Sequence, residues 1–201
     1  MKNIEKLVDK TVNGSGDSDR HIMTLFSIAL ASKSKVMIEL GVRGGDTTIP
    51  LLEAAKINGG MLYSVDINDV DFEVSDDLKP HWKFIKSDAI KFLEEWDPTK
   101  VVDFFYVDDW HSYEHVKREL EIIDTLVSPS SVVLLHDLMY GGTCPFYHVD
   151  LTNDGGAQWT KGGPYRAVAE LNPQFWEFST LPWNNGLTLL RKKYSSKFSN
   201  K

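Results

Sequence analysis

The sequence predicts an α/β fold in which a mostly parallel sheet carries helices on both faces. Two observations predict it: short apolar runs alternate with amphipathic segments over the first two thirds of the chain, and the last pair of apolar runs flanks an Asn-Gly dipeptide. With 201 residues, of which 42% are hydrophobic, the chain is long enough for one large domain with a substantial core.

Five apolar runs are the expected parallel strands. Most are too short for helices, and they are rich in β-branched or aromatic residues. Their apolarity is continuous rather than alternating, which is typical of strands that are covered on both faces. The runs span residues 35–42, 61–67, 82–87, 101–107 and 131–135.

Helices are expected around these strands, because parallel strands need right-handed crossover connections. The clearest spans residues 113–127, where apolar residues recur at spacings of three and four and form one stripe. Asp46 is expected to cap the helix that follows the first strand. The other helices are expected at residues 18–32, 47–58, 88–96 and 164–171.

The last third of the chain has a different character. Residues 140–163 contain glycines and aromatic side chains without a clear period, and we expect a functional loop there that acts as a lid over a substrate. Residues 175–180 and 187–191 flank Asn185-Gly186, which predicts an antiparallel hairpin. We therefore expect an N-terminal helical segment at 1–34, the main domain at 35–193 and a tail at 194–201.

Composition limits the classes of partner. Asp plus Glu outnumber Lys plus Arg by 29 to 22, which gives a net charge of −7, and this excess argues against a general nucleic-acid binder. The single cysteine, Cys144, excludes an intrachain disulfide and a cysteine-based zinc site. The N-terminus lacks a hydrophobic signal region, and no apolar run approaches the roughly 18 residues that cross a bilayer. We expect a cytoplasmic protein with no membrane or nucleic-acid partner.

Glycines and acids stand where the first three strands end. Residues 39–45 (ELGVRGG) close the first strand, Asp66 closes the second and Asp88 follows the third. Open α/β sheets bind ligands at this edge, where Asp66 is placed to accept from ribose hydroxyls and Asp88 from an adenine amino group. Neither the G-x-G-x-x-G spacing nor a phosphate loop is present. Simpler readings stay open: a tight turn without a ligand, a solvated acid at Asp66 and a helix N-cap at Asp88.

Together these features resemble a class I S-adenosylmethionine-dependent methyltransferase. The resemblance is carried by ELGVRGGDTT at residues 39–48 and by Asp66, Asp88 and Asp108. A narrower likeness is to the cephalosporin hydroxylase and macrolide-sugar O-methyltransferase families, whose pattern is D-G-x-H-x-Y, a helix, and then H-D or E-D. Here the corresponding residues are VDDWHSY at 107–113 and LHD at 135–137. The resemblance implies a Rossmann-like class I methyltransferase sheet with five parallel strands and a C-terminal antiparallel hairpin.

The resemblance also implies which residues bind the cofactor, S-adenosylmethionine. Asp66 would bind the ribose hydroxyls, and Asp108 would lie beside the methionine end. Asp46 stands where the family usually has serine, near the cofactor's carboxylate, and Arg43 would have to offset its charge. Asp109 replaces a glycine of the pattern. The remaining implied residues shape the pocket or border the adenine: Glu39, Gly41, Gly45, Asp88 and Ala89.

A metal and a base are predicted at the next two strand ends. Asp108 closes the fourth strand, and His136 and Asp137 close the fifth, so adjacent parallel strands would bring the three side chains together. Two carboxylates and an imidazole can hold a divalent cation, Mg²⁺ or a transition metal. His111 is the predicted general base, and His115 is expected at the surface. The alternatives are that His136 and Asp137 only form hydrogen bonds near the cofactor, and that His111 is an exposed residue at a helix start.

The predicted function is methyl transfer from S-adenosylmethionine to a hydroxyl of a small molecule, a sugar or another natural product, with or without a metal. The expected partner is this small-molecule acceptor, and a homo-oligomer is left open. The alternative from another class is a non-catalytic nucleotide-binding or assembly protein on the same fold. An NAD-dependent reductase is disfavoured by the missing third glycine and by the hairpin.

Overall fold

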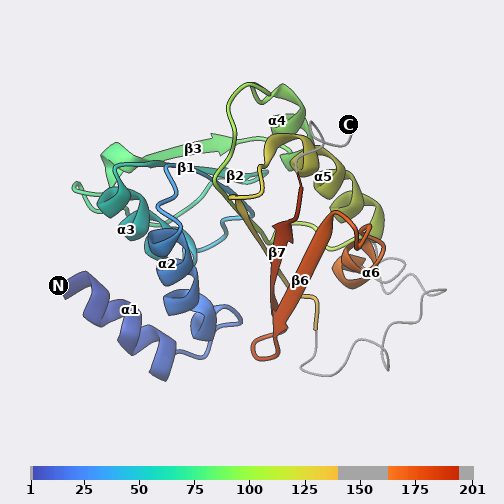
Figure 1. The fold of residues 1–201 in the computed structure, drawn as a ribbon. Helices are drawn as coiled ribbons and strands as arrows, with labels where there is room; N and C mark the ends of the chain where they lie inside the picture. The colour runs from blue at the N-terminus through green and yellow to red at the C-terminus, as the bar shows by residue number, and fades with distance from the viewer. Residues whose placement is uncertain (1, 140–162, 195–201) are drawn as a thin grey trace.

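The structure, a computed structural model, describes residues 2–139 and 163–194 (Figure 1). Seven strands form one sheet in the order β3-β2-β1-β4-β5-β7-β6. The first five are parallel, whereas β7 runs antiparallel to β5 and β6 antiparallel to β7. The predicted fold class is therefore confirmed. The strands are β1 (Val36–Leu40), β2 (Met61–Asp66), β3 (Trp82–Lys86), β4 (Phe104–Val107), β5 (Val132–His136), β6 (Trp176–Leu181) and β7 (Leu187–Lys192).

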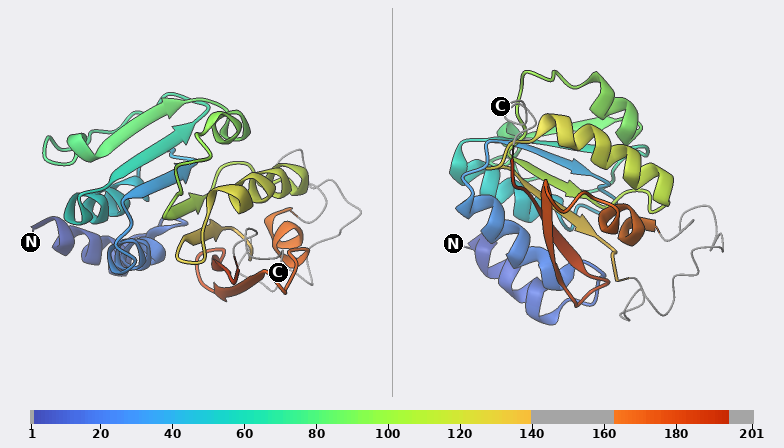
Figure 2. Two further views of the ribbon diagram at one scale, coloured as in Figure 1. Left: turned by 45° about the horizontal axis from the view of Figure 1, so that its top comes forward. Right: turned by 45° about the vertical axis from the view of Figure 1, so that its right-hand side comes forward.

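Helices cover both faces of this sheet, as Figure 2 shows. One layer consists of α1 (Lys2–Asn13), α2 (Ile22–Ala31) and α3 (Thr48–Asn58). The other consists of α4 (Ala89–Glu95), α5 (Tyr113–Leu126) and α6 (Gly163–Ala169). Successive side chains of β4 alternate between the layers: Phe104 packs with the first and Phe105 with the second. Two apolar faces explain why the strand sequences are continuously apolar.

The N-terminal segment differs from the prediction in detail. The helix expected at 18–32 is a short 3₁₀ helix (Asp19–His21) followed by α2, and α1 precedes both. Leu7 of α1 and Phe26 of α2 are buried in the same cluster as Met37 of β1. These N-terminal helices therefore share the core of the sheet.

The cap predicted for α3 was wrong. The N-cap residue is Thr47, and its side chain makes no capping hydrogen bond. The Thr47 hydroxyl donates instead to Glu39 (2.7 Å), and Asp46 pairs with Lys10 of α1. Contacts with β1 and α1, rather than with the end of α3, therefore determine the orientation of both side chains.

The C-terminal hairpin is confirmed. Asn184, Asn185 and Gly186 all have positive φ, at 46°, 63° and 88°, which is the left-handed conformation that Asn and Gly adopt at tight turns. The lid predicted at 140–163 lies outside the described residues except for Gly163, as does the predicted tail after residue 194. Within residues 2–139 and 163–194, no helix combines the length and apolarity that spanning a membrane demands.

Candidate active site

A cleft of about 450 Å³ opens at the carboxyl ends of β1 to β4. Ligands bind at this edge in open α/β sheets. Six of the eight predicted cofactor residues line it: Gly41, Arg43, Asp66, Asp88, Ala89 and Asp108. The other two, Glu39 and Gly45, are not among its lining residues.

Asp66 fixes the glycine-rich loop while facing the cleft. Its Oδ2 accepts from the backbone amides of Val42 (3.0 Å) and Arg43 (3.2 Å), and its Oδ1 accepts from the amide of Asn68 (2.8 Å). Burial alone would raise the pKa of Asp66, but these amide donors outweigh burial and lower it. Asp66 is therefore an ionised acceptor held in place by backbone, and not simply a solvated acid.

Asp88 is the N-cap of α4, as the simpler reading had it. Its Oδ1 accepts from the amide of Lys91 (2.9 Å). Because Asp88 also lines the cleft, its predicted contact with an adenine amino group stays a prediction.

A contact within the protein, rather than a ligand, requires glycine at position 41. Gly41 has φ 85°, and a Cβ there would overlap the carbonyl oxygen of Asp108. Absence of a side chain thus lets the end of β1 lie against the loop that follows β4. A Cβ added at Gly44, three residues further along, would meet no heavy atom of the described residues within 4 Å, apart from its chain neighbours.

Glu39 lies behind the cleft rather than in it. It is fully buried and accepts from the hydroxyls of Thr47 (2.7 Å), Thr48 (2.8 Å) and Ser64 (2.7 Å). Burial raises the pKa of Glu39 to about 7, against the opposing effect of these three donors. Glu39 joins β1 to β2 and to the start of α3, so it shapes the cleft indirectly.

Arg43 does not offset the charge of Asp46, contrary to the expectation. Its guanidinium pairs with Asp17 (3.2 Å), whereas Asp46 pairs with Lys10. The N-terminal segment therefore supplies the neutralising charge. The reason is topological, because α1 and the turn after it lie beside the glycine-rich loop.

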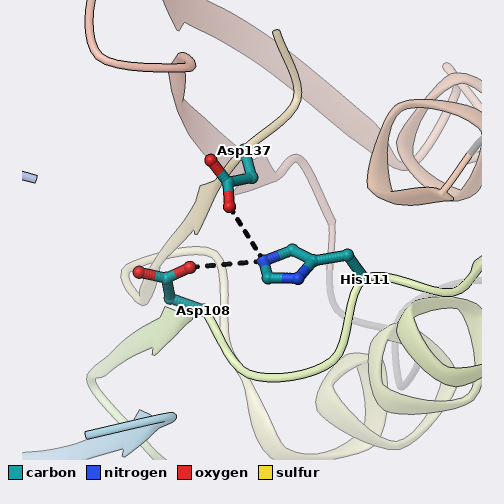
Figure 3. Close-up of side chains that lie close together, drawn as sticks. All are labelled: Asp108, His111 and Asp137. Carbon is teal, nitrogen blue, oxygen red and sulfur yellow. Dashed lines mark hydrogen bonds and ion pairs between the residues drawn. The ribbon is translucent and has the colours of Figure 1, made fainter. Parts of the chain in front are cut away.

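The predicted base lies between two of the predicted metal ligands (Figure 3). His111 Nε2 is 3.0 Å from Asp137 Oδ2 and 3.4 Å from Asp108 Oδ1. Burial alone would lower the pKa of His111, but the two carboxylates raise it to about 9. His111 is only 8% exposed, so the alternative of an exposed histidine at the helix start was wrong.

His136 adjoins the same two acids. Its Nδ1 is 3.2 Å from Asp137 Oδ1 and 3.5 Å from Asp108 Oδ1, and its side chain is 1% exposed. Neither ring nitrogen has a partner with hydrogen-bond geometry among the described residues. Val107 pairs with Leu135 in the parallel β4–β5 ladder. The next residues, Asp108 and His136, therefore lie opposite each other at the ends of neighbouring strands, as the sequence predicts. The donor atoms of Asp108, His111 and Asp137 lie within 4.8 Å of one another, close enough to hold a cation.

One residue beside this cluster was missed. The ring centroid of His21 lies 5.4 Å from that of His136, edge to face, and His21 Nε2 donates to the carbonyl of Trp183 (2.9 Å). Burial and the nearby His136 lower the pKa of His21 to about 4. No local motif marks His21, because the contact depends on how the hairpin turn meets the N-terminal segment.

A second cleft, of about 440 Å³, lies between α5, α6 and the hairpin. Its residues include Leu120, Leu171 and Trp176, and none of the predicted site residues. Of these two clefts, only the first is built on the carboxyl ends of parallel strands, the edge at which open α/β sheets bind ligands.

The comparisons agree with the fold. A family model described as "Methyltransferase domain" matches residues 38–138. An O-methyltransferase from Bacillus cereus, in complex with SAH, has a TM-score of 0.68 at 15% identity, over 96% of this chain and 91% of that one. TomG, an O-methyltransferase of Streptomyces achromogenes in complex with SAM, has a TM-score of 0.64 at 15% identity, over 96% and 90%.

MycE, a methyltransferase of the mycinamycin biosynthetic pathway in complex with Mg and SAH, has a TM-score of 0.58 at 16% identity. The match covers 92% of this chain and 52% of MycE. Identities this low show a common fold only. Among curated proteins, no sequence matches.

Proposed function

Because this chain belongs to the methyltransferase-domain family matched at residues 38–138 and is a class I S-adenosylmethionine-dependent methyltransferase, we propose that it methylates a hydroxyl oxygen of a small molecule. The observation that carries this proposal is the cluster of Asp108, His111 and Asp137. It adjoins the cleft to which six predicted cofactor residues contribute, and Asp108 belongs to both.

Binding of the donor substrate, S-adenosylmethionine, uses the cleft. Asp66 accepts from the ribose hydroxyls, since it is ionised and held by three backbone amides. Asp88 and Ala89 border the adenine, and Gly41 and Arg43 border the chain that carries the sulfonium. Asp108 at the end of β4 then faces the methyl group to be transferred.

His111 is the proposed base. As the acceptor oxygen attacks the methyl carbon in line, the carbon–sulfur bond breaks and S-adenosylhomocysteine leaves. His111 Nε2 takes the hydroxyl proton. At neutral pH the two carboxylates keep His111 protonated, so it must first lose that proton to act. Asp108 and Asp137 thus both orient the imidazole and set its proton affinity.

The residues around His111 also fit a divalent cation. Asp137 Oδ1 and His136 Nδ1 face each other at 3.2 Å without hydrogen-bond geometry. The other ring nitrogen, His136 Nε2, is buried without a hydrogen-bond partner among the described residues, and such atoms are usually satisfied. Asp108 and Asp137 would hold the ion, with His136 as the nitrogen donor, so that His111 keeps its role as the base. Bound there, it would neutralise the carboxylates that keep His111 protonated and would acidify a coordinated hydroxyl. Vicinal hydroxyls suit such an ion, which favours a sugar or a polyhydroxylated natural product as acceptor.

An untargeted labelling experiment tests this function. The purified protein is incubated with a small-molecule extract and S-adenosylmethionine that carries a deuterated methyl group, and mass spectrometry locates the label. We expect the label on an oxygen of a hydroxylated compound. Chelation should lower the rate and added Mg²⁺ should restore it, while S-adenosylmethionine affinity persists. Label on nitrogen or carbon would contradict O-methylation, and tight cofactor binding without any transfer would favour a non-catalytic protein.

A further inference from the structure

Three metal-ligating side chains lie together beside the cleft, outside the cluster described above. Asp109 follows β4, and His115 and Glu119 lie one turn apart on α5. His115 Nε2 is 3.0 Å from Asp109 Oδ2 and 3.4 Å from Glu119 Oε1. The three donor atoms lie within 4.8 Å of one another. His115 was predicted at the surface, and the structure corrects this: its side chain is 15% exposed and lies between two acids.

Glu119 is the unusual member of this trio. It is 0% exposed, and neither of its carboxylate oxygens has a hydrogen-bond partner among the residues that the structure describes. Asp109 Oδ1 is also buried without one. Buried carboxylate oxygens without donors are costly, and a single imidazole nitrogen facing both acids supplies at most one proton and one positive charge. A cation ligated by both acids would give these oxygens the partner that they lack among the described residues.

We propose that Asp109, His115 and Glu119 bind a divalent transition-metal ion of the Zn²⁺ type. Ligand bonds of about 2.0–2.2 Å at tetrahedral angles place donor atoms about 3.3 Å apart. The two separations from His115 Nε2, 3.0 and 3.4 Å, fit this spacing, and the oxygens of Asp109 and Glu119 lie within 4.8 Å of each other. One imidazole and two carboxylates favour Zn²⁺ over Mg²⁺, which prefers oxygen ligands throughout.

The ion would connect the loop after β4 to α5. Asp109 and His115 line the cleft, whereas Glu119 lies behind it, so a further coordination position is accessible from the cleft side. None of the three residues belongs to the cluster of Asp108, His111 and Asp137, and the inference does not depend on the proposed methyl transfer. The competing explanation is an ion-pair cluster that binds no metal.

Counting bound Zn²⁺ in matched variants of the full chain separates the two explanations. Each protein is dialysed against Zn²⁺ and its metal content is measured by elemental analysis. We expect E119Q and D109N each to bind one equivalent less than the wild type. E121Q is the control: Glu121 lies two residues further along α5, is exposed and pairs with Arg118 at 3.5 Å, so this variant should keep the wild-type number.

Zn²⁺ should also raise the melting temperature of the wild type more than that of E119Q, because an ion that binds only the folded state stabilises it. Circular dichroism establishes that each variant is folded, and H115Q replaces E119Q if that variant does not fold. The proposal stands only if the two variants tested each lose one equivalent while E121Q loses none. A wild type that binds no Zn²⁺, or variants that bind as much as the wild type, would overturn it.

Discussion

Tyr106 donates a hydrogen bond of 2.9 Å to Oδ2 of Asp108, while His111 and His136 face the other oxygen of the same carboxylate. Tyr106 is fully buried on β4, two residues before the acid that it holds. The hydroxyl therefore fixes how Asp108 presents its Oδ1 to the two imidazoles. It is a positioning group for the proposed site.

We predict that Y106F lowers the free energy of unfolding by about 1–3 kcal/mol, because it leaves an oxygen of the partly buried Asp108 carboxylate without its donor. Urea denaturation measures this. Y113F is the matched control: the Tyr113 hydroxyl donates to an exposed acid, Glu170, so its loss should cost less. Equal costs for the two variants would mean that Tyr106 does not support Asp108.

Gly41 and Gly44 form a second matched pair. G41A adds a Cβ that overlaps the Asp108 carbonyl oxygen and forces a non-glycine residue to φ 85°. The left-handed conformation alone costs about 1–2 kcal/mol. We expect G41A to unfold at lower urea concentration and to lose S-adenosylmethionine affinity, whereas G44A should retain both properties. Wild-type behaviour of G41A would show that the two loops do not need their close contact.

Asp66 is the residue on which the predicted binding of S-adenosylmethionine most depends. D66A should weaken S-adenosylmethionine binding by about 1–3 kcal/mol, the scale for hydrogen bonds to a charged group. It removes the ribose acceptor and also the acceptor for the amides of Val42 and Arg43. Calorimetry measures the affinity. D69N is the control, because Asp69 is exposed and pairs with Lys86. Unchanged affinity in a folded D66A protein would remove Asp66 from the site.

Glu39 predicts a pH dependence of stability. Burial raises the pKa of Glu39 from 4.5 to about 7, so the folded protein keeps a proton that the unfolded chain releases. The stabilisation that this proton gives the folded state is complete below pH 4.5 and is lost as the pH rises to about 7. It amounts to about 3 kcal/mol. Across that window the free energy of unfolding should fall less steeply for E39Q than for the wild type, as urea denaturation at several pH values would measure. Parallel curves would contradict this.

Residues that directly follow an apolar run could be placed from the sequence. Asp66, Asp108 and His136 each stand at or just after a strand end, and parallel strands end at one edge of the sheet. Their placement at one edge of the sheet therefore follows from the parallel arrangement of the strands, and Asp108 meets His136 because β4 and β5 are neighbours. Asp88 could be assigned to the same edge, although its capping role was equally compatible with the sequence.

Contacts made by the N-terminal segment could not be predicted in this way. Lys10 reaches Asp46, and His21 reaches His136, because α1 and the turn after it pack beside the glycine-rich loop. The apolar periodicity of a sequence predicts which face of a helix is buried, but it does not predict which loop packs against that helix. The same limit explains His115: it flanks the apolar stripe of α5 and reads as solvent-exposed, yet the loop after β4 places Asp109 beside it.

The measurement that tests the central claim most directly is the single-turnover rate of methyl transfer in H111Q, with the acceptor found by the labelling experiment. H81Q is the control, because His81 packs near Gly60, away from the cluster. Glutamine keeps a polar side chain at position 111 but cannot take up the acceptor proton. The account predicts that the H111Q rate falls by about 10²–10⁴ while affinity for S-adenosylmethionine is unchanged. A wild-type rate in H111Q, with chemistry limiting, would contradict the account, because the proton would then leave by another route.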